Sequence, residues 1–549
     1  MTDTPTAPAD AATTALQNRL RAVGEAVRGG DMARAMALAR EGLDMGQEHP
    51  GLLSLRALWL EQQGQFEAAL LDIERALEIA PGDPAALNAK GLIYDKLQRA
   101  PDAVAAFREA TIAAPRFAPA FHNLGWASEM VGELGDARDA YEQALALKPD
   151  YVEPLAHLSR LSLRRGDPNS ARIHAQQALR VDPDYATALV AYAEAELEEG
   201  EPLGAEARLR TVVAGPKATP LDRGVAQKLL GDALDAQGRY AEAFAAYTDG
   251  NRELQALYAP RFAAGRGQTA PAMLVWLIRY MNETSAQLWA ARPFPPRTPD
   301  GPAAHVFMTG FPRSGSDFLE HALGADPSTA LLRGHDALGD GVRDFMADAA
   351  DLDHLARKGD GDLEPYRRAY WRRVRDARID PAGKLFIDRL PLNAVRAPLI
   401  ARLFPQAVTL FTLRDPRDVV LSCFRGRFQM NPTMYEFLSL EGAARAFDLT
   451  MRLTLLYREK LPIPIGLIRY EDLVDKPEGQ LVSACGFIGV EPSAEMRAFT
   501  ALESAKAAAA GTPGYYGETV GHWRRYADEL APVMEILAPW ISLFGYPAD

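Results

Sequence analysis

The sequence predicts two architectures in one chain: an all-helical solenoid of repeated helix pairs, followed by an α/β domain with a doubly wound, mainly parallel sheet. Three observations lead to this prediction. Small and turn residues recur every 34 residues in the first half. A proline cluster follows, and short apolar runs then alternate with helical segments. At 549 residues the chain is too long for one core, so separate domains are expected.

Composition narrows the functional classes. A hydrophobic share of 48% and a charged share of 24% are ordinary for a soluble, folded chain. The net charge of -13 argues against nucleic-acid binding, which needs clustered Lys and Arg. The start, MTDTPTAPADAATT, has neither a basic stretch nor an apolar run, and no later segment approaches 18 uninterrupted apolar residues. With only two cysteines as well, we expect a cytoplasmic protein without a membrane span.

Three residue types share one register in the first half. They are Pro81, Pro115, Pro149 and Pro183; Gly132, Gly166 and Gly200; and Ala69, Ala103, Ala137, Ala171 and Ala205. Alanine lets paired helices approach closely, glycine supplies a left-handed turn, and proline ends the second helix. The stretch FHNLGWASEMVGELGDARDAYEQALALKP (Phe121 to Pro149) resembles the tetratricopeptide repeat family. An alanine-rich bundle without true periodicity is the alternative, which the shared register disfavours.

The same pattern suggests domain limits. We expect a disordered N-terminus over residues 1–16, about seven repeats over 17–255, a capping helix and proline-rich linker over 256–302, and the α/β domain over 303–549. The segment RPFPPRTPDGP holds five prolines in eleven residues and marks the linker. Stacked helix pairs leave a concave face, so we expect a protein or peptide partner there.

The second half alternates strand-like and helical runs. HVFMTG, LFIDRL, VTLFTLR and IGLIRY predict buried strands, while APLIARLF and VVLSCF predict helices between them. Ligands of such sheets bind at the carboxyl ends of the strands.

The first predicted strand leads into GFPRSGSD (Gly310 to Asp317), which has the G-x-x-x-x-G spacing of a phosphate-binding loop. A nucleotide hydrolase would carry Lys-Ser or Lys-Thr where Ser316 and Asp317 stand, which argues against a metal-dependent kinase or hydrolase. About a hundred residues later, LRDPRDVVLSCF places Arg414 at a strand end and Ser422 on the next helix, where both can reach one phosphate.

These motifs, together with IDRLPLN and RYEDLV, resemble the sulfotransferases that use 3'-phosphoadenylyl sulfate, especially bacterial tetratricopeptide-linked members and the tyrosylprotein sulfotransferases. The resemblance covers most of Val306 to Tyr546. It implies that the donor is 3'-phosphoadenylyl sulfate, that the product is adenosine 3',5'-bisphosphate, and that no metal is needed. The residues implied to bind the 5'-phosphosulfate end are Arg313, Ser314, Gly315, Ser316 and Asp317. Arg414 and Ser422 would bind the 3'-phosphate, with Tyr470 beside them and His522 as a further cofactor contact.

The sequence departs from this family at several positions. Asp317 stands where the family has Thr; its carboxylate suits a helix start by about 0.3 to 1 kcal/mol but would oppose a phosphate about 4 Å away by about 4 kcal/mol at a dielectric of 20. Asp317 therefore either limits cofactor affinity or faces solvent. The segment expected to supply a glutamate base reads STALLRGHDALGD, where His335 and Asp336 are the replacements. His335 is a candidate general base or a loop histidine without a task.

Arg389 replaces the family lysine and keeps a positive charge for the sulfuryl oxygens. The candidate catalytic residues are thus Arg313, His335 and Arg389. Surface roles are the alternative for Arg313 and Arg414. The segment SAKAAAAGTPGYYGET, on the adenine side, is alanine-rich where the family is polar.

Two functional hypotheses follow. The first is an enzyme that transfers a sulfuryl group from this donor to a hydroxyl of a protein or glycan acceptor. The second is a tetratricopeptide scaffold for protein binding whose sulfotransferase-like domain is weakened or inactive.

Overall fold

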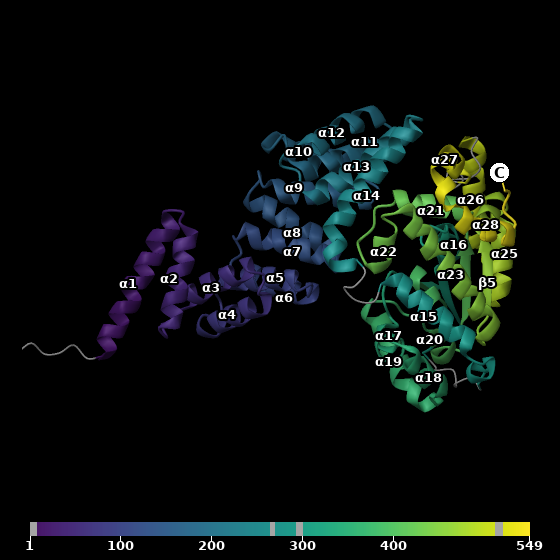
Figure 1. Cartoon of the computed structure of the whole chain (residues 1–549), viewed down its shortest axis with the longest axis horizontal. Helices are drawn as coiled ribbons and strands as arrows, with labels where there is room; N and C mark the ends of the chain where they lie inside the picture. The colour runs from purple at the N-terminus through teal and green to yellow at the C-terminus, as the bar shows by residue number, and fades with distance from the viewer. Residues whose placement is uncertain (1–7, 264–268, 293–299, 511–519, 549) are drawn as a thin grey trace, which may run out of the picture. The chain divides into compact units, whose positions relative to one another are not determined.

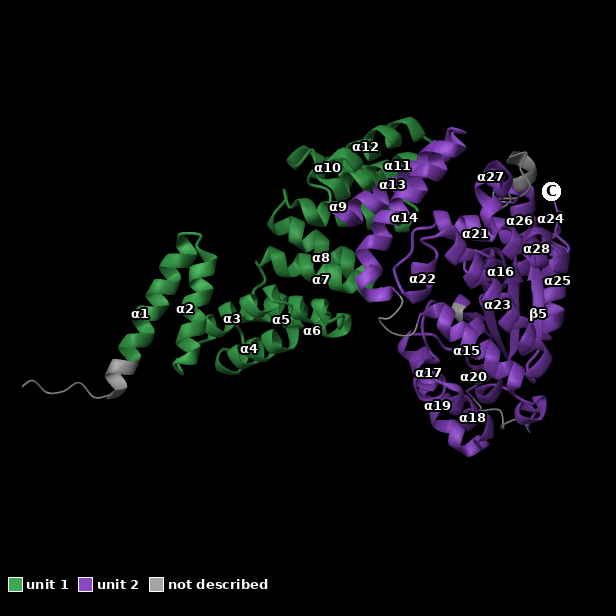
Figure 2. Ribbon diagram, in the orientation of Figure 1, with its two compact units in different colours: residues 1–218 green, residues 219–549 purple. Residues whose placement is uncertain are grey.

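The computed structural model describes residues 8–263, 269–292, 300–510 and 520–548. It divides into two compact units, residues 1–218 and 219–549 (Figure 2). No helix among the described residues is both long and apolar enough to cross a membrane.

The first unit consists of helices joined by short turns (Figure 1). They are α1 (Pro8–Arg28), α2 (Met32–Asp44), α3 (Pro50–Gln62), α4 (Phe66–Ile79), α5 (Pro84–Lys96), α6 (Ala100–Ala113), α7 (Ala118–Met130), α8 (Leu134–Leu147), α9 (Val152–Arg164), α10 (Pro168–Val181), α11 (Ala186–Glu198) and α12 (Pro202–Ala214). Helix α1 begins at Pro8, where the sequence predicted disorder up to residue 16; residues 1–7 lie outside the described ranges.

The predicted repeat register is confirmed by burial and backbone geometry. The five registered alanines are fully buried. The glycines at 132, 166 and 200 have left-handed φ angles of 85°, 72° and 77°, which only glycine adopts readily. Each registered proline lies two residues past a helix end, after α4, α6, α8 and α10. At Gly125 a Cβ would lie 2.6 Å from the Tyr141 ring, so glycine allows α7 and α8 to pack closely.

The second unit begins with α13 (Pro220–Ala236) and α14 (Tyr240–Phe262), which repeat this packing: a Cβ at Gly231 would lie 2.4 Å from the Tyr247 ring. Next come α15 (Ala270–Glu283) and the 3-10 helix η1 (Ala286–Trp289). The sequence predicted a cap for the solenoid here, but α15 packs against α23 (Leu440–Lys460) and buries Leu274 and Leu277 in the α/β core. Most of the predicted proline linker, residues 293–299, lies outside the described ranges.

The sheet has five parallel strands in the order β2-β3-β1-β4-β5. Its strands are β1 (Ala304–Gly310), β2 (Thr329–Arg333), β3 (Leu385–Arg389), β4 (Val408–Leu413) and β5 (Ile465–Arg469). The four predicted strands are confirmed as β1, β3, β4 and β5. Strand β2, one of the two edge strands, was not predicted, because its five residues follow a short Pro-Ser segment and lead directly into Gly334.

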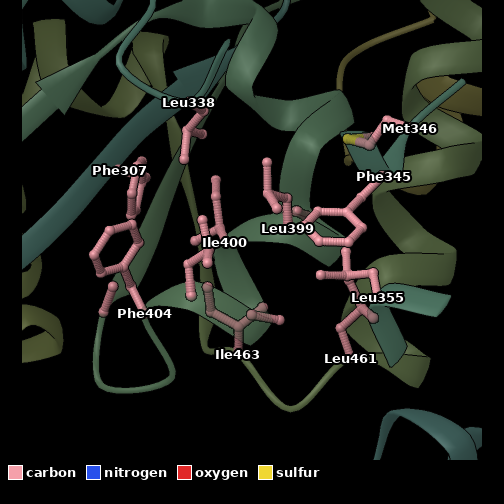
Figure 3. Packing of buried hydrophobic residues seen from close by; sticks show 14 of the residues in the cluster. Phe307, Leu338, Phe345, Met346, Leu355, Leu399, Ile400, Phe404, Leu461 and Ile463 are labelled. Atoms are coloured by element: carbon pink, nitrogen blue, oxygen red, sulfur yellow. The ribbon is translucent and has the colours of Figure 1, made fainter. Parts of the chain in front are cut away.

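Two hydrophobic cores lie on opposite faces of the sheet, because alternate residues of a strand point to opposite sides. Phe307 of β1 and Phe386 of β3 belong to one core, and their neighbours Val306 and Ile387 to the other. Figure 3 shows the first core, where Phe307 and Phe404 lie near Ile400 and Ile463. The predicted doubly wound α/β architecture is therefore confirmed.

Helices fill the connections between the strands. They are α16 (Ser316–Gly324), α17 (Gly339–Phe345), α18 (Ala349–Arg357), α19 (Asp360–Asp376), η2 (Pro391–Arg396), α20 (Ala397–Leu403), α21 (Pro416–Arg425), α22 (Pro432–Glu436), α23, α24 (Tyr470–Asp475), α25 (Pro477–Ile488), α26 (Ala494–Ala510), η4 (His522–Tyr526), α27 (Ala527–Leu530), η5 (Ala531–Val533) and α28 (Met534–Leu543). The predicted helices APLIARLF and VVLSCF correspond to α20 and α21.

Candidate functional site

The predicted phosphate loop connects the end of β1 to the start of α16. Gly315 has a left-handed φ of 84°, and a Cβ there would lie 2.1 Å from the Tyr470 ring, so only glycine fits. Arg313 also has a positive φ, 69°, which is unusual for a residue with a Cβ and typical of a functionally constrained loop. The loop is thus held in one shape, with the Tyr470 ring packed against Gly315.

The two sequence clusters meet at the carboxyl ends of β1 and β4. Arg313 Nε donates a hydrogen bond of 2.9 Å to Ser422 Oγ, and Arg414 donates one of 3.2 Å to the Arg313 carbonyl. The Arg414 guanidinium lies over the Tyr470 ring, 5.2 Å from its centroid. Residues about a hundred positions apart therefore form one group with two cationic side chains and a hydroxyl.

Two further contacts tie this group together. Ser314 is buried and its hydroxyl shares a hydrogen bond of 2.7 Å with that of Thr412, at the end of β4. Cys423 donates its thiol to the Pro312 carbonyl at 3.4 Å, and burial raises the pKa of this thiol to about 12. The thiol therefore stays protonated and structural near pH 7. Sequence reasoning missed Thr412, because only the pairing of β1 with β4 brings it to the loop.

Arg389, a predicted catalytic residue, is engaged by acidic side chains. It donates to Asp317 and, at 3.1 Å, to Ser316 Oγ. Its Nε lies 2.9 Å from Glu320 Oε2, close enough for an ion pair though not aligned as a hydrogen bond. Glu320 is buried on α16 and also pairs with Arg333. Asp317 and Glu320 together therefore match the charges of Arg389 and Arg333 in this structure.

His335 and Asp336, the candidate bases, lie in the exposed segment after β2. Nδ1 of His335 donates to the Arg333 carbonyl at 2.7 Å, which leaves Nε2 as the proton acceptor. Asp336 instead has both carboxylate oxygens on Arg396, at 2.7 and 3.0 Å. Of the two, His335 has the freer basic atom.

Asp388, one residue before Arg389, is buried beneath this region. Burial raises its pKa to about 7, against the effect of a hydrogen bond from Tyr370 at 2.8 Å. Asn393 also donates to Asp388, at 3.2 Å, and accepts from Arg396 at 3.2 Å, so this buried set supports the side chain that holds Asp336. Within the described ranges, no three His, Cys, Asp or Glu side chains are grouped as metal ligands.

His522, a predicted cofactor contact, lies on η4 beside Arg425, one turn after Ser422 on α21. Its Nε2 is 3.1 Å from Asp235 Oδ1 of α13. Burial alone would raise the pKa of Asp235, but hydrogen bonds from His522 and Tyr526 and the charge of Arg425 lower it to about 2. The final part of the predicted adenine-side segment, residues 511–519, lies outside the described ranges.

The chain contains a parallel α/β domain that has arginine and hydroxyl side chains at the ends of its strands. It also contains helical repeats. Residues 305–494 match the Sulfotransferase family. Residues 118–151, and with a second profile 20–84 and 158–220, match the Tetratricopeptide repeat. The chain therefore combines tetratricopeptide repeats with a sulfotransferase-family domain.

Among solved structures, similar chains include two described as tetratricopeptide repeat proteins and one described as pilF. One from Parabacteroides merdae has 16% identity and a TM-score of 0.36, and the match covers 44% of this chain and 93% of that chain. A thermophilic one from Thermus thermophilus has 23% identity and a TM-score of 0.27, with 36% and 99% covered. Pseudomonas aeruginosa pilF has 19% identity and a TM-score of 0.33, with 38% and 97% covered. No curated protein matches the chain.

Proposed function

We propose that the chain is a sulfotransferase that moves a sulfuryl group from 3'-phosphoadenylyl sulfate to a hydroxyl of a protein or glycan. The observation that carries this proposal is the meeting of Arg313, Arg414 and Ser422 at the carboxyl ends of β1 and β4, inside the sulfotransferase-family match. Charge-assisted hydrogen bonds from arginine are among the strongest that proteins make to phosphate.

The hydrogen-bond donors of this site suit a nucleotide with two phosphate groups. Arg414 and Ser422 would hold the 3'-phosphate, while the loop from Arg313 to Asp317 and the start of α16 would hold the 5' end. Helix N-termini favour anions because their backbone N–H groups lack intrahelical partners. Tyr470 supports this loop by packing against Gly315.

Each remaining candidate has one task in this proposal. When bound, the donor supplies an activated sulfuryl group in a reaction for which we propose no metal. Arg313 and Arg389 stabilise negative charge on the oxygens around the reacting centre. Nε2 of His335 accepts the proton of the acceptor hydroxyl, since Nδ1 is already committed to the Arg333 carbonyl.

A second function is favoured by one specific observation. Arg389 is paired with Asp317 and Glu320, so its charge is already compensated. A domain in this state suits a scaffold that binds the nucleotide but transfers slowly, and whose main task is protein binding through the repeats. We propose that the repeats bind a protein or peptide partner on their concave face.

Because Cys423 and Cys485 are both free and buried, we place the chain in the reducing cytoplasm.

Turnover distinguishes these functions. The full chain is incubated with 3'-phosphoadenylyl sulfate carrying a labelled sulfuryl group, together with peptide and glycan acceptors. Label on an acceptor that disappears in Arg414→Ala supports the enzyme. If the chain binds adenosine 3',5'-bisphosphate in a separate titration but labels no acceptor, the result supports the scaffold. If it neither binds the bisphosphate nor labels an acceptor, the proposed nucleotide site is refuted.

A further inference from the structure

Helices α13 and α14 bury a polar pair that the proposed chemistry does not use. Lys228 of α13 and Asn251 of α14 are each only 1% exposed. Lys228 Nζ donates to Asn251 Oδ1 at 2.6 Å. The two helices cross closely here, since a Cβ at Gly250 would lie 2.8 Å from the Gly224 carbonyl. Burying an ammonium group is costly unless it is hydrogen-bonded, so the partners of Lys228 matter.

The shared partner of this pair is a helix end in the α/β domain. Lys228 Nζ and Asn251 Nδ2 each donate to the Phe424 carbonyl at 3.0 Å, although these residues are 196 and 173 positions away. Phe424 is the penultimate residue of α21, and carbonyls of a last helical turn lack intrahelical donors. A cation also suits the negative end of a helix dipole. Lys228 and Asn251 thus form a cap for α21 from outside the helix.

The capped end of α21 is next to the proposed phosphate site. Ser422 precedes Phe424 by two residues and accepts from Arg313, while Cys423 donates to Pro312 of the loop. One side of α21 therefore contacts the phosphate loop, and its last carbonyls contact α13 and α14. Other contacts reinforce the second side: the Phe244 and Phe424 rings stack at 5.1 Å, and Arg425 pairs with Asp235 at 3.2 Å.

We propose that Lys228 and Asn251 are positioning residues for the 3'-phosphate site. They hold the last turn of α21 and so fix the place of the Ser422 hydroxyl. The inference rests on the proposed function, and it makes α13 and α14 part of the nucleotide site, although the sequence predicts that they form a repeat. Without the cap, the last turn has unsatisfied carbonyls and frays, which moves Ser422 relative to Arg313.

The test compares two ligands on the full chain by calorimetry. Adenosine 3',5'-bisphosphate uses the 3'-phosphate contacts, whereas adenosine 5'-phosphate does not. We expect Lys228→Met to weaken the bisphosphate by at least about fivefold and the 5'-phosphate by less than about twofold. Asn251→Leu should act in the same direction. General damage to the fold would instead weaken both ligands equally.

Lys460→Met is the matched control. Lys460 Nζ also donates to helix-end carbonyls, those of Asn282 at 3.0 Å and Thr284 at 2.9 Å, next to the end of α15. It therefore loses the same kind of contact, but no contact to α21. We expect its ratio of the two affinities to equal that of the wild type.

Hydrogen exchange separates failure of this inference from failure of the proposed function. In Lys228→Met the amides of the last turn of α21 should exchange faster than in the wild type. If the wild type does not bind the bisphosphate more tightly than adenosine 5'-phosphate, the proposed function fails. Faster exchange in Lys228→Met would then still show that Lys228 caps α21, but not that it positions a phosphate site. An unchanged affinity ratio in both variants overturns the positioning role, and unchanged exchange overturns the cap itself.

Discussion

Replacing Asp317 by Thr should tighten the binding of adenosine 3',5'-bisphosphate. The substitution removes a negative charge from the start of α16, which we propose as the 5'-phosphate site. It also releases Arg389 from one of its two carboxylates, since Asp317 and Glu320 share that guanidinium. The substitution therefore makes the loop more positive by one charge, and it leaves the Arg389 guanidinium with Glu320 as its remaining carboxylate partner of the two.

The magnitude follows from distance and exposure. A charge about 6 Å from a phosphate contributes about 3 kcal/mol at an effective dielectric of 20 and about 0.7 kcal/mol in water. The Asp317 side chain is 59% exposed, so the value for water is the closer guide. We expect a gain of about 1 kcal/mol, which is about fivefold in affinity. The gain should shrink at 1 M salt, where the Debye length is about 3 Å.

The assay is calorimetric titration of both proteins, with Asp102→Thr as the matched control. Asp102 is likewise an acidic residue in the first turn of a helix, α6, and pairs with Arg99 at 2.7 Å. It belongs to α6 and not to the loop, and its loss changes the net charge by the same amount. The same affinity in Asp317→Thr and wild type, or an equal gain in Asp102→Thr, would show that the Asp317 carboxylate does not oppose the phosphate.

Three further predictions follow from the structure. His335→Ala should lower sulfuryl transfer at least about tenfold with little change in bisphosphate affinity, because a base acts on the acceptor; a parallel loss of affinity in titrations would argue against that role. Burial, with a smaller contribution from the charge of Arg427, lowers the pKa of Lys228 to about 7 against the opposing effect of Asp232. The unfolded chain keeps this proton up to about pH 10.4. The free energy of unfolding of the wild type should therefore rise between pH 7 and pH 10 relative to that of Lys228→Met. A difference between their melting temperatures that stays constant over this range would contradict the prediction. A fragment of residues 1–218 should be monodisperse in gel filtration and helical by circular dichroism. A fragment that ends at Ala291 should aggregate, because α15 then lacks the helix α23 against which it packs. Equal behaviour of the two fragments would count against the packing of α15.

The fold was predictable where the sequence pattern is local. The repeats follow from residues that each pair of helices needs at its own crossing, and four strands follow from buried apolar runs. Strand β2 was not predicted because TALLR has only three apolar residues in succession between Thr329 and Arg333, a weaker strand signal than the other apolar runs. The packing of α15 was also not predicted, because an apolar helix face does not indicate which hydrophobic core it packs against.

The site was predictable to the extent that single residues bear the chemistry. Arg313, Arg414 and Ser422 could be found because strand ends place them at one edge of the sheet. The pairing of Arg389 with Asp317 and Glu320 depends on how α16 faces β3, which no spacing reveals. Lys228 is harder still: in the sequence it is one of several charged residues of a helix, and only tertiary packing brings it to Phe424.

In the proposed function, the chain binds, through Arg414, a nucleotide that carries a 3'-phosphate. The most direct test of this binding is calorimetric titration of the full chain with adenosine 3',5'-bisphosphate, repeated with Arg414→Ala. We expect one site with a dissociation constant of about 10 μM or tighter, weakened at least about tenfold in the variant. No measurable binding to the wild type, or equal binding to both proteins, would contradict it.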